Sequence, residues 1–553
     1  MKQVEPRHPE GPLLSFEFGD FDWTRVPGVN EAMVLRALRQ ERHGLLARLI
    51  RSSATPRDRW HSFDATSWEH PWLVPENLRA ARTFEDKFLE RLADRTDLQE
   101  PRQYHYGFAG NIANNMMMRA RVLRKHGQLI DVVLHPQDDF VMSDPGWEYA
   151  DIQLPDGERR VPVLAERGLE LPEVHGVVRT LVMEEYSDVW RAAMDSTPSE
   201  WPRAHPLAPR LRQMDVIQYS AYLGFWPTIE ALQNYDAVFA AQAPYLAYLS
   251  GRPYLAAQTG GDLFFEASRD DVFGRLQRRS YRRSKAILAT NPWAYSAARR
   301  FGFNHVVYAP LLVDTDAYSP GPSSGRRQWE AETGGSFFVL ATARLDRTWK
   351  KSDVGFDGFK KFALKVPEAR LLLVGWGNDL NELLDDFGKE GLRDRVYVLP
   401  VSGKKRLVDY LRGADCVIDQ FRIGYYGATA LEALACGAPV IMKLLSEQYD
   451  AVCKTGAPPV LNAESADEVA TALERLFKST DLRQRLADQS VSWIRSNHSG
   501  DAWAETYDLL LRATAAGVEF DFAGSPLNRA LGKHEIEYQR EQLRNAPAFP
   551  NYV

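Results

Sequence analysis

The chain has 553 residues, of which 44% are hydrophobic and 26% are charged, and its formal net charge is −6. This length exceeds one ordinary core, so we expect two domains with appendages, and the composition excludes a largely disordered or collagen-like protein. The slightly acidic balance argues against a protein whose main role is to coat nucleic acid, and no nucleic-acid partner is expected.

The cysteines and the hydropathy pattern indicate the compartment. Cys416, Cys436 and Cys453 lack CxxC spacing, and two of them lie in apolar runs, as reduced core residues do. The N-terminal residues lack the apolar stretch of a signal peptide, and no window approaches 18 uncharged apolar residues. We therefore expect a cytoplasmic protein, with peripheral contact at the inner membrane face left open.

The first half of the chain reads as an extension followed by an α/β domain. Residues 1–100 form the extension, in which 77–96 has the pattern of an amphipathic helix. Residues 101–320 alternate short apolar runs with helical stretches, interrupted by an irregular insertion at about 137–210. Near-continuous apolar runs of four to six residues indicate a parallel sheet that is covered on both faces.

The second half repeats this alternation more clearly. A Pro/Gly/Ser stretch at 319–327 predicts a flexible linker, and 326–500 then carries at least five apolar runs spaced by helices. Residues 501–553 are expected to form a helical tail that packs back on the first domain. The predicted fold is α/β, with two doubly wound Rossmann-like domains facing each other across a cleft, where such sheets bind ligands.

One loop and helix of the second domain combine glycines with an acid. Gly424 and Gly427 would let the backbone approach a ligand, and the free N–H groups of Ala428 and Thr429 at a helix start would attract an anion. Glu432 lies one turn further, where its carboxylate could accept hydrogen bonds from two neighbouring hydroxyls, as on a ribose. The open alternative is that Glu432 caps its helix or pairs with a nearby Lys or Arg.

The run GxxGxxxLEALACGAPVI resembles the donor-site segment of GT-B glycosyltransferases, especially the large retaining family 4, the group 1 glycosyl transferases. In that family two acids flank seven residues; the second matches Glu432, and the first falls on Gly424, where it is absent. The resemblance to relatives with a "DQ…GxYG" version, which includes Tyr426, implies that Asp419 or Gln420 takes over the contact with the transferred sugar.

A second match follows the first strand of this domain. Arg344 with Lys350 or Lys351 fills the places where the family carries an Arg and a Lys, a pair that would stabilise a departing diphosphate without a metal. Solvated surface is the alternative for the lysines. The resemblance also implies that Gly375 lies in a turn near the nucleotide and that the backbone of 396–401 reads the base.

The first domain carries weaker matches. Gly110 and Asn111 resemble the glycine loop that lets the acceptor approach the donor phosphate, although such a loop equally serves turn chemistry. Asp262 resembles the Asp of an "HGxDL" strand end and could orient an acceptor hydroxyl, while Thr259 stands where the family has a histidine. An ordinary turn or N-cap residue is the alternative for Asp262.

A basic stripe is predicted on one helix face. Its members, spaced for a single face, are Arg275, Arg278, Arg279 and Arg282. Such a stripe could dock on anionic lipid or an anionic acceptor, but we favour a solvated helix face. The histidines are scattered and no carboxylate-rich cluster occurs, so no metal site is expected.

These patterns together predict a glycosyltransferase that uses a nucleotide diphosphate sugar, UDP- or GDP-linked, and needs no other cofactor. The resemblance implies retention of anomeric configuration, and the acceptor could be a glycan, a lipid-linked molecule or a small molecule. Two alternatives stay open: a GT-B phosphorylase or epimerase, and a catalytically silent subunit that binds nucleotide sugar as a scaffold.

Overall fold

The structure is a computed structural model. It describes residues 70–98, 102–135, 141–154, 160–180, 225, 227–264, 266–268, 272–347, 350–377, 379–530 and 532–535. Most of the predicted extension 1–100, including three of its four tryptophans, lies outside the described residues.

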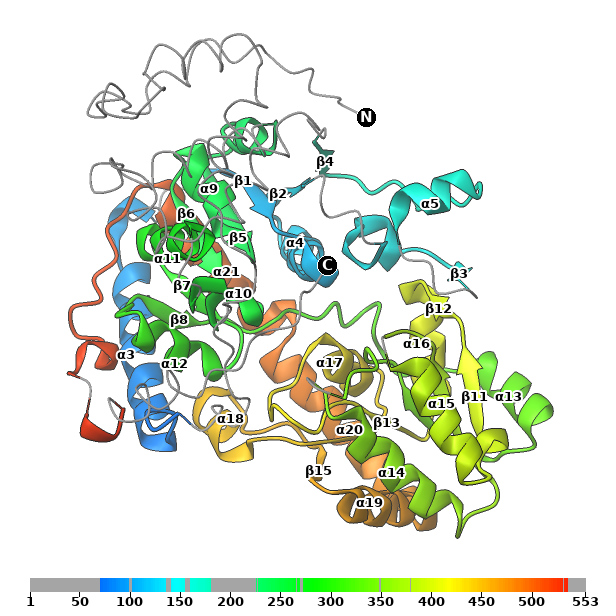
Figure 1. The fold of residues 1–553 in the computed structure, drawn as a ribbon. Coiled ribbons are helices and arrows are strands. Elements are labelled where there is room, and N and C mark those ends of the chain that lie inside the picture. The colour runs from blue at the N-terminus through cyan, green and yellow to red at the C-terminus, as the bar shows by residue number, and fades with distance from the viewer. Residues whose placement is uncertain are drawn as a thin grey trace, which may run out of the picture.

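The first domain is built on a seven-stranded, wholly parallel sheet with the strand order β4-β2-β1-β5-β6-β7-β8. Apart from the edge strand at 177–179, its strands are largely buried apolar runs, as the sequence predicts, because helices cover both faces (Figure 1). They are β1 (His105–Ala109), β2 (Leu129–Leu134), β4 (Val177–Arg179), β5 (Ala237–Ala241), β6 (Tyr254–Ala257), β7 (Ile287–Ala289) and β8 (Val306–Tyr308).

The second domain has a six-stranded parallel sheet with the order β11-β10-β9-β13-β14-β15. Its strands are β9 (Phe337–Ala341), β10 (Ala369–Val374), β11 (Val396–Leu399), β13 (Cys416–Ile418), β14 (Val440–Met442) and β15 (Leu461–Asn462). The order reverses between β9 and β13, so the loops that follow these two strands meet at the point where doubly wound sheets bind ligands. The predicted fold class is confirmed.

The helices alternate with these strands. In the first domain they are α4 (Asn115–Lys125), α5 (Val161–Glu166), α9 (Pro244–Ser250), α10 (Gly261–Phe264), α11 (Val272–Arg283) and α12 (Trp293–Arg300). In the second they are α13 (Gly325–Thr333), α14 (Ser352–Ala363), α15 (Leu380–Lys389), α16 (Lys404–Gly413), α17 (Ala428–Ala435), α18 (Ser446–Val452), α19 (Ala466–Lys478) and α20 (Thr480–Asn497). Within the described residues, none of the helices is both long and apolar enough to cross a membrane.

The described segments of the insertion predicted at about 137–210 contact both domains. β4 adds an edge strand to the first sheet. Earlier in the insertion, β3 (Gln153–Leu154) pairs antiparallel with β12 (Val401–Ser402) of the second domain (Figure 1). Gly403 N donates to Ile152 O at 3.0 Å, so the insertion is hydrogen-bonded to the second domain.

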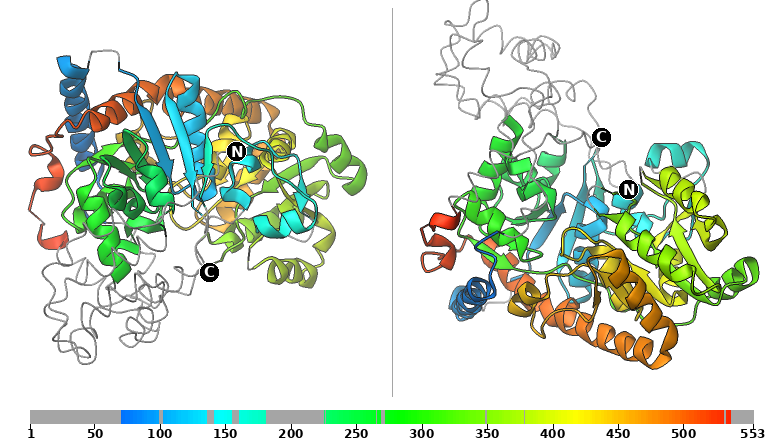
Figure 2. Two further views of the ribbon diagram at one scale, coloured as in Figure 1. Left: turned by 90° about the horizontal axis from the view of Figure 1, so that it is seen from above. Right: turned by 60° about the horizontal axis from the view of Figure 1, so that its bottom comes forward.

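Both ends of the described chain pack on the first domain. α3 (Pro75–Ala93) corresponds to the helix predicted over 77–96, and nearby Trp72 stacks on Tyr295 with ring centroids 5.9 Å apart. After α20 the chain continues into α21 (Gly500–Ala515), which lies along α4 and the strands β5 and β6 (Figure 2).

The chain passes between the domains at two places. The stretch predicted as a flexible linker is anchored: Arg412 Nε donates to Ser319 O at 2.8 Å, and α13 already begins at Gly325. The second crossing, at His498, is bonded to the chain after β8, because Val313 N donates to His498 O at 2.8 Å and the His498 ring contacts Leu311 O at 2.6 Å. The two crossings therefore hold each other.

Candidate active site

The loop between β9 and α14 carries the predicted diphosphate-binding cations. Arg344 Nη2 donates to Asp346 Oδ2 at 2.9 Å, and Lys350 N donates to Asp346 O at 3.0 Å, so one residue fixes both cations in the loop. Gly377, with φ +116°, lets the next loop of the sheet pack on this one, because a Cβ there would lie 2.4 Å from Leu345 O. Lys351 is exposed and has φ +46°.

The neighbouring loop, between β13 and α17, separates the two candidates for the sugar contact. The Gln420 side chain forms hydrogen bonds within its own loop: it accepts from Ile423 N at 3.2 Å and donates to Tyr425 O. Here its side chain is engaged within the protein, and a contact of Gln420 with the sugar stays a prediction. Asp419 differs, because within the described residues its buried carboxylate oxygens have no hydrogen-bond partner, and Lys350 Nζ lies 3.9 Å from its Oδ1.

Two other predicted donor-site residues serve packing. Tyr426 is 5% exposed, stacks on Tyr449 with centroids 4.3 Å apart, and its hydroxyl lies 3.1 Å from the His498 ring. Gly375 allows strand packing, since a Cβ there would lie 2.9 Å from Val398 Cγ1. These contacts give both residues a packing role, and their roles at the donor site stay predictions.

The N-terminus of α17 has open space beside its backbone, as the glycine at position 427 predicts. Gly427 is its N-cap, and a Cβ added there would meet no atom within 4 Å. Ala428 and Thr429 form the first turn, and Ala428 lines a cleft between the domains.

Glu432 is paired, as the open alternative allowed. Lys404 Nζ donates to Glu432 Oε1 at 2.5 Å, and Glu432 is 7% exposed. Glu148, from the insertion, faces the same ammonium, and its Oε2 accepts from Tyr318 OH at 3.1 Å. Burial favours a neutral Lys404, but Glu432 and Glu148 outweigh this and raise the pKa of the ammonium. Burial raises the pKa of Glu148, and Lys404 only partly offsets it.

Sequence reasoning missed Lys404 and Glu148. One signal for Lys404 was available: lysine at the first position of a helix is electrostatically unfavourable, which suggests a compensating acid nearby. Glu148 lies in a segment without periodicity, and no sequence signal singles it out.

The cleft between the domains is narrow. Its volume is about 20 Å³, far below the several hundred Å³ of typical ligand pockets, and Arg344, Lys350 and Asp419 do not line it. Its lining comes from both domains and comprises Ala113, Asn114, Asn115, Met118, Glu148, Leu311, Leu312, Val313, Ala428, Leu431 and Glu432.

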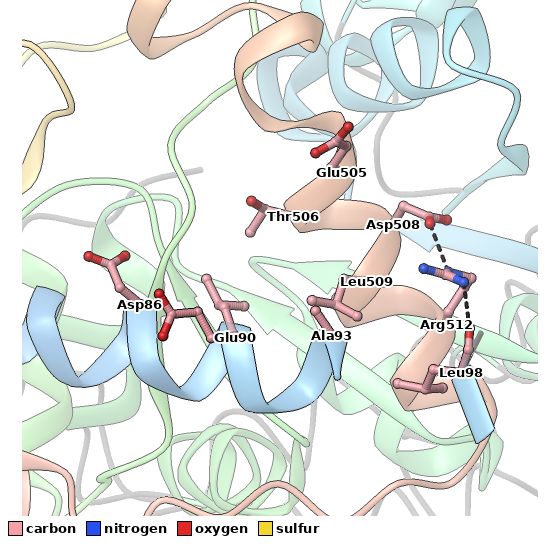
Figure 3. A pocket seen from close by; sticks show the side chains of 10 residues that line it. Asp86, Glu90, Ala93, Leu98, Glu505, Thr506, Asp508, Leu509 and Arg512 are labelled. Carbon is pink, nitrogen blue, oxygen red and sulfur yellow. Dashed lines mark hydrogen bonds and ion pairs between the residues drawn. The ribbon is translucent and has the colours of Figure 1, made fainter. Parts of the chain in front are cut away.

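A larger hollow of about 800 Å³ lies elsewhere, between α3 and α21 (Figure 3). Four carboxylates line it, from Asp86, Glu90, Glu505 and Asp508. Its one lining cation, Arg512, is paired with Asp508 at 2.7 Å. This surface would repel a diphosphate, so size does not make it the donor site.

The predicted residues of the first domain shape their own loops. Gly110 has φ +75°, and a Cβ there would lie 1.8 Å from Ala241 O, so this position requires glycine. Asn111 is fully buried; its amide donates to Asn114 Oδ1 and Ser143 O, and its Oδ1 accepts from Met117 N. Both amide N–H groups of Asn111 are thus engaged within the protein, and a contact of Asn111 with a ligand stays a prediction.

Asp262 is an ordinary turn residue. Its carboxylate accepts from Gly260 N at 3.0 Å, Thr259 N at 3.2 Å and Tyr281 OH at 2.6 Å, and it is 2% exposed. Burial raises its pKa against the opposing effect of these bonds. These bonds fit the alternative of a turn residue, and the role of Asp262 in orienting an acceptor stays a prediction.

The arginines of the basic stripe on α11 whose side chains are described each contact a neighbouring residue of the first domain. Arg278 Nη1 donates to Ala267 O at 2.5 Å, Arg279 lies over the Tyr248 ring and Arg282 over the Phe303 ring. The side chain of Arg275 lies outside the described residues. The contacts give no support to membrane docking.

Within the described ranges, no group of three or more His, Cys, Asp or Glu side chains could hold a metal ion. Metal independence nevertheless stays a prediction.

Comparisons with known proteins agree with this geometry. Residues 326–493 match the family "Glycosyl transferases group 1". A mannosylfructose-phosphate synthase of Agrobacterium fabrum is 26% identical over 228 residues, 39% of this chain and 50% of that protein. A D-inositol 3-phosphate glycosyltransferase of Nocardiopsis dassonvillei is 27% identical over 215 residues, 36% of this chain and 48% of that protein. This chain thus spans about half the length of these curated relatives.

A solved structure supports the fold over a longer stretch. The sucrose-phosphate synthase of Thermosynechococcus elongatus is 16% identical, and the match covers 75% of this chain and 100% of that one with a TM-score of 0.50. The predicted GT-B fold is confirmed, and the match to group 1 glycosyl transferases over residues 326–493 agrees with the predicted family.

Proposed function

We propose that this protein transfers a sugar from a nucleotide diphosphate sugar to a hydroxyl of an acceptor. The observation that carries the proposal is the position of Lys350 at the β9–β13 switch point: it shares the loop after β9 with Arg344, and its Nζ lies 3.9 Å from Asp419 Oδ1 in the loop after β13. Phe421 N donates to Lys350 O at 2.8 Å, which joins the two loops. Fixed cations beside a helix start form a site for a diphosphate.

The proposed reaction breaks the bond between the anomeric carbon and the diphosphate oxygen and forms a bond to the acceptor oxygen. The acceptor proton passes to the departing phosphate oxygen, so the chain needs no separate general base. Arg344 and Lys350, with Lys351 at the rim, would stabilise the charge that accumulates on the diphosphate. Since these charges are built in, we propose a reaction without metal and with retained configuration.

Glu432 is proposed to hold the ribose. Lys404 occupies one of its oxygens, but a carboxylate offers about four acceptor positions, so hydroxyls can bind beside the ammonium. In this proposal Lys404 holds the Glu432 carboxylate in place.

The silent-subunit alternative has one observation in its favour. Position 424, where the family has its first acid, is a glycine with φ +80° packed against Leu445. A pure binding subunit would keep nucleotide affinity without turnover, so binding and turnover must be measured separately.

The first test is a thermal-shift panel with UDP, GDP, ADP, CMP and TDP, with and without EDTA. A ligand at one hundred times its Kd should stabilise the fold by about 2.7 kcal/mol. Stabilisation by one nucleotide regardless of EDTA supports the proposal and identifies the donor class. Silence from all five would contradict it, and binding without turnover across an acceptor panel would favour the silent subunit.

A further inference from the structure

Asp419 is a buried acid without the partners that other buried acids have. Its side chain is fully covered, and neither carboxylate oxygen accepts a hydrogen bond in the described part of the chain. By contrast, buried Glu85 accepts from Arg82, Tyr295 OH and Tyr308 N. A buried carboxylate left unpaired in a native fold requires an explanation, and a ligand is one.

Lys350 is a loose partner for Asp419. The 3.9 Å between Lys350 Nζ and Asp419 Oδ1 exceeds a hydrogen bond. Burial raises the pKa of Asp419, and Lys350 lowers it only in part. The ammonium, with its side chain 27% exposed, can therefore turn toward a stronger anion, such as a diphosphate, at small cost.

The loop offers no other acid for a sugar. A side chain at Gly424 would meet Leu445 Cγ at 2.7 Å, so the family's first acid cannot be placed there without moving Leu445. Leu445 N also donates to Gly424 O at 2.9 Å, which holds the two residues together. Asp419 is the one carboxylate between β13 and α17.

We propose that Asp419 detects the sugar of the donor, in an inference that rests on the proposed function. When the diphosphate draws Lys350 away, hydroxyls of the sugar take the place of the ammonium at Asp419. A nucleoside diphosphate alone leaves this buried carboxylate without a partner, so the product binds more weakly than the donor. The site therefore selects neutral sugars with free hydroxyls and disfavours uronic acids, whose carboxylate would face Asp419.

The test compares affinities by titration calorimetry of the full chain with UDP, UDP-glucose and UDP-glucuronate, or with the matching set for the nucleotide that the thermal panel selects. In the unmodified protein, the neutral nucleotide sugar should bind about tenfold more tightly than the nucleoside diphosphate, since hydrogen bonds to a charged group are worth more than one factor of ten. The uronate should lose that advantage. Asp419→Asn should bring the ratio close to one and relieve the discrimination against the uronate.

Asp415→Asn is the matched control. Asp415 also borders β13, but it accepts from Phe338 N at 2.9 Å and pairs with Arg326 at 3.0 Å, so its loss should lower stability and leave the affinity ratio unchanged. If Asp419→Asn does not fold, Asp419→Ser serves in its place. A ratio that Asp419→Asn leaves unchanged overturns this inference alone, whereas absence of any nucleotide binding overturns the proposed function with it.

Discussion

Among the lysine–carboxylate pairs of the second domain, two that bury their carboxylate differ in how complete they are. Lys404 and Glu432 meet at 2.5 Å, whereas Lys350 and Asp419 stay 3.9 Å apart and both Asp419 oxygens lack hydrogen bonds to the described residues. The first pair is a finished buried salt bridge, and the second is an incomplete one. The difference separates a charge that the fold has satisfied from a charge that a ligand can satisfy.

The largest effect is expected from breaking the finished pair. Lys404→Met leaves Glu432 and Glu148 buried without their shared cation, which should destabilise the fold by about 3 kcal/mol. Thermal unfolding measures this, with Lys404→Arg as the variant that keeps the charge. A loss below about 1 kcal/mol would show that the pair is screened by water. For the same reason Glu432→Ala should lower stability and is not a clean probe of turnover.

Removing a cation from the switch point should affect turnover rather than folding. Arg344→Ala should reduce kcat about a hundredfold, equivalent to about 2.7 kcal/mol of transition-state stabilisation. Its side chain is 36% exposed, so the melting temperature should change little. Arg347→Ala is the control, since Arg347 lies in the same loop but pairs with Glu382 and Asp386. Equal losses in both variants would contradict the assignment of Arg344.

Removing the charge of Asp419, in the incomplete pair, should raise the stability of the fold rather than lower it. Burial raises the pKa of Asp419, so this group favours the fold while protonated and costs stability as the pH rises past its unfolded value near 4. Asp419→Asn should therefore match the unmodified protein near pH 4 and be roughly 1 kcal/mol more stable at pH 7. Unfolding across that pH range measures the difference. A variant that is less stable at pH 7 would assign Asp419 a structural role.

The smallest effect on stability is expected from an exposed ion pair. Arg406 and Asp151 join the second domain to the insertion at 2.9 Å, but their side chains are 37% and 55% exposed. A double-mutant cycle with Arg406→Ala and Asp151→Ala should give a coupling of about 0.5 kcal/mol or less, which falls further in salt. A coupling above about 1 kcal/mol would mean that the contact between the domains is stronger than solvent exposure allows.

The fold was largely predictable because its strands are long apolar runs between clear helices. The runs that became β9 and β10 need both faces covered, and only a doubly wound sheet provides this. β3 and β12 were not predictable, since each has two residues and their pairing depends on how the domains meet.

The site was predictable in its location but not in the state of each side chain. Arg344, Lys350 and Asp419 follow adjacent strands of a parallel sheet, which brings them together whatever the details. Whether a polar side chain is still available depends on partners far along the chain or in the same loop. Asp262 is taken by Tyr281, Asn111 by Ser143 and Glu432 by Lys404, and none of these pairings follows from sequence spacing.

The bonded crossings at Val313 and His498 determine how the molecule can move. Two chain segments that hold each other act as a single hinge, so the domains are free to rotate about it but not to slide apart. The pairing of β3 with β12 is a second tie between the insertion and the second domain. A rotation of the second domain away from the first must therefore either break this short ladder or move β3 along with the second domain. We expect any opening of the domains to be limited by a few backbone hydrogen bonds.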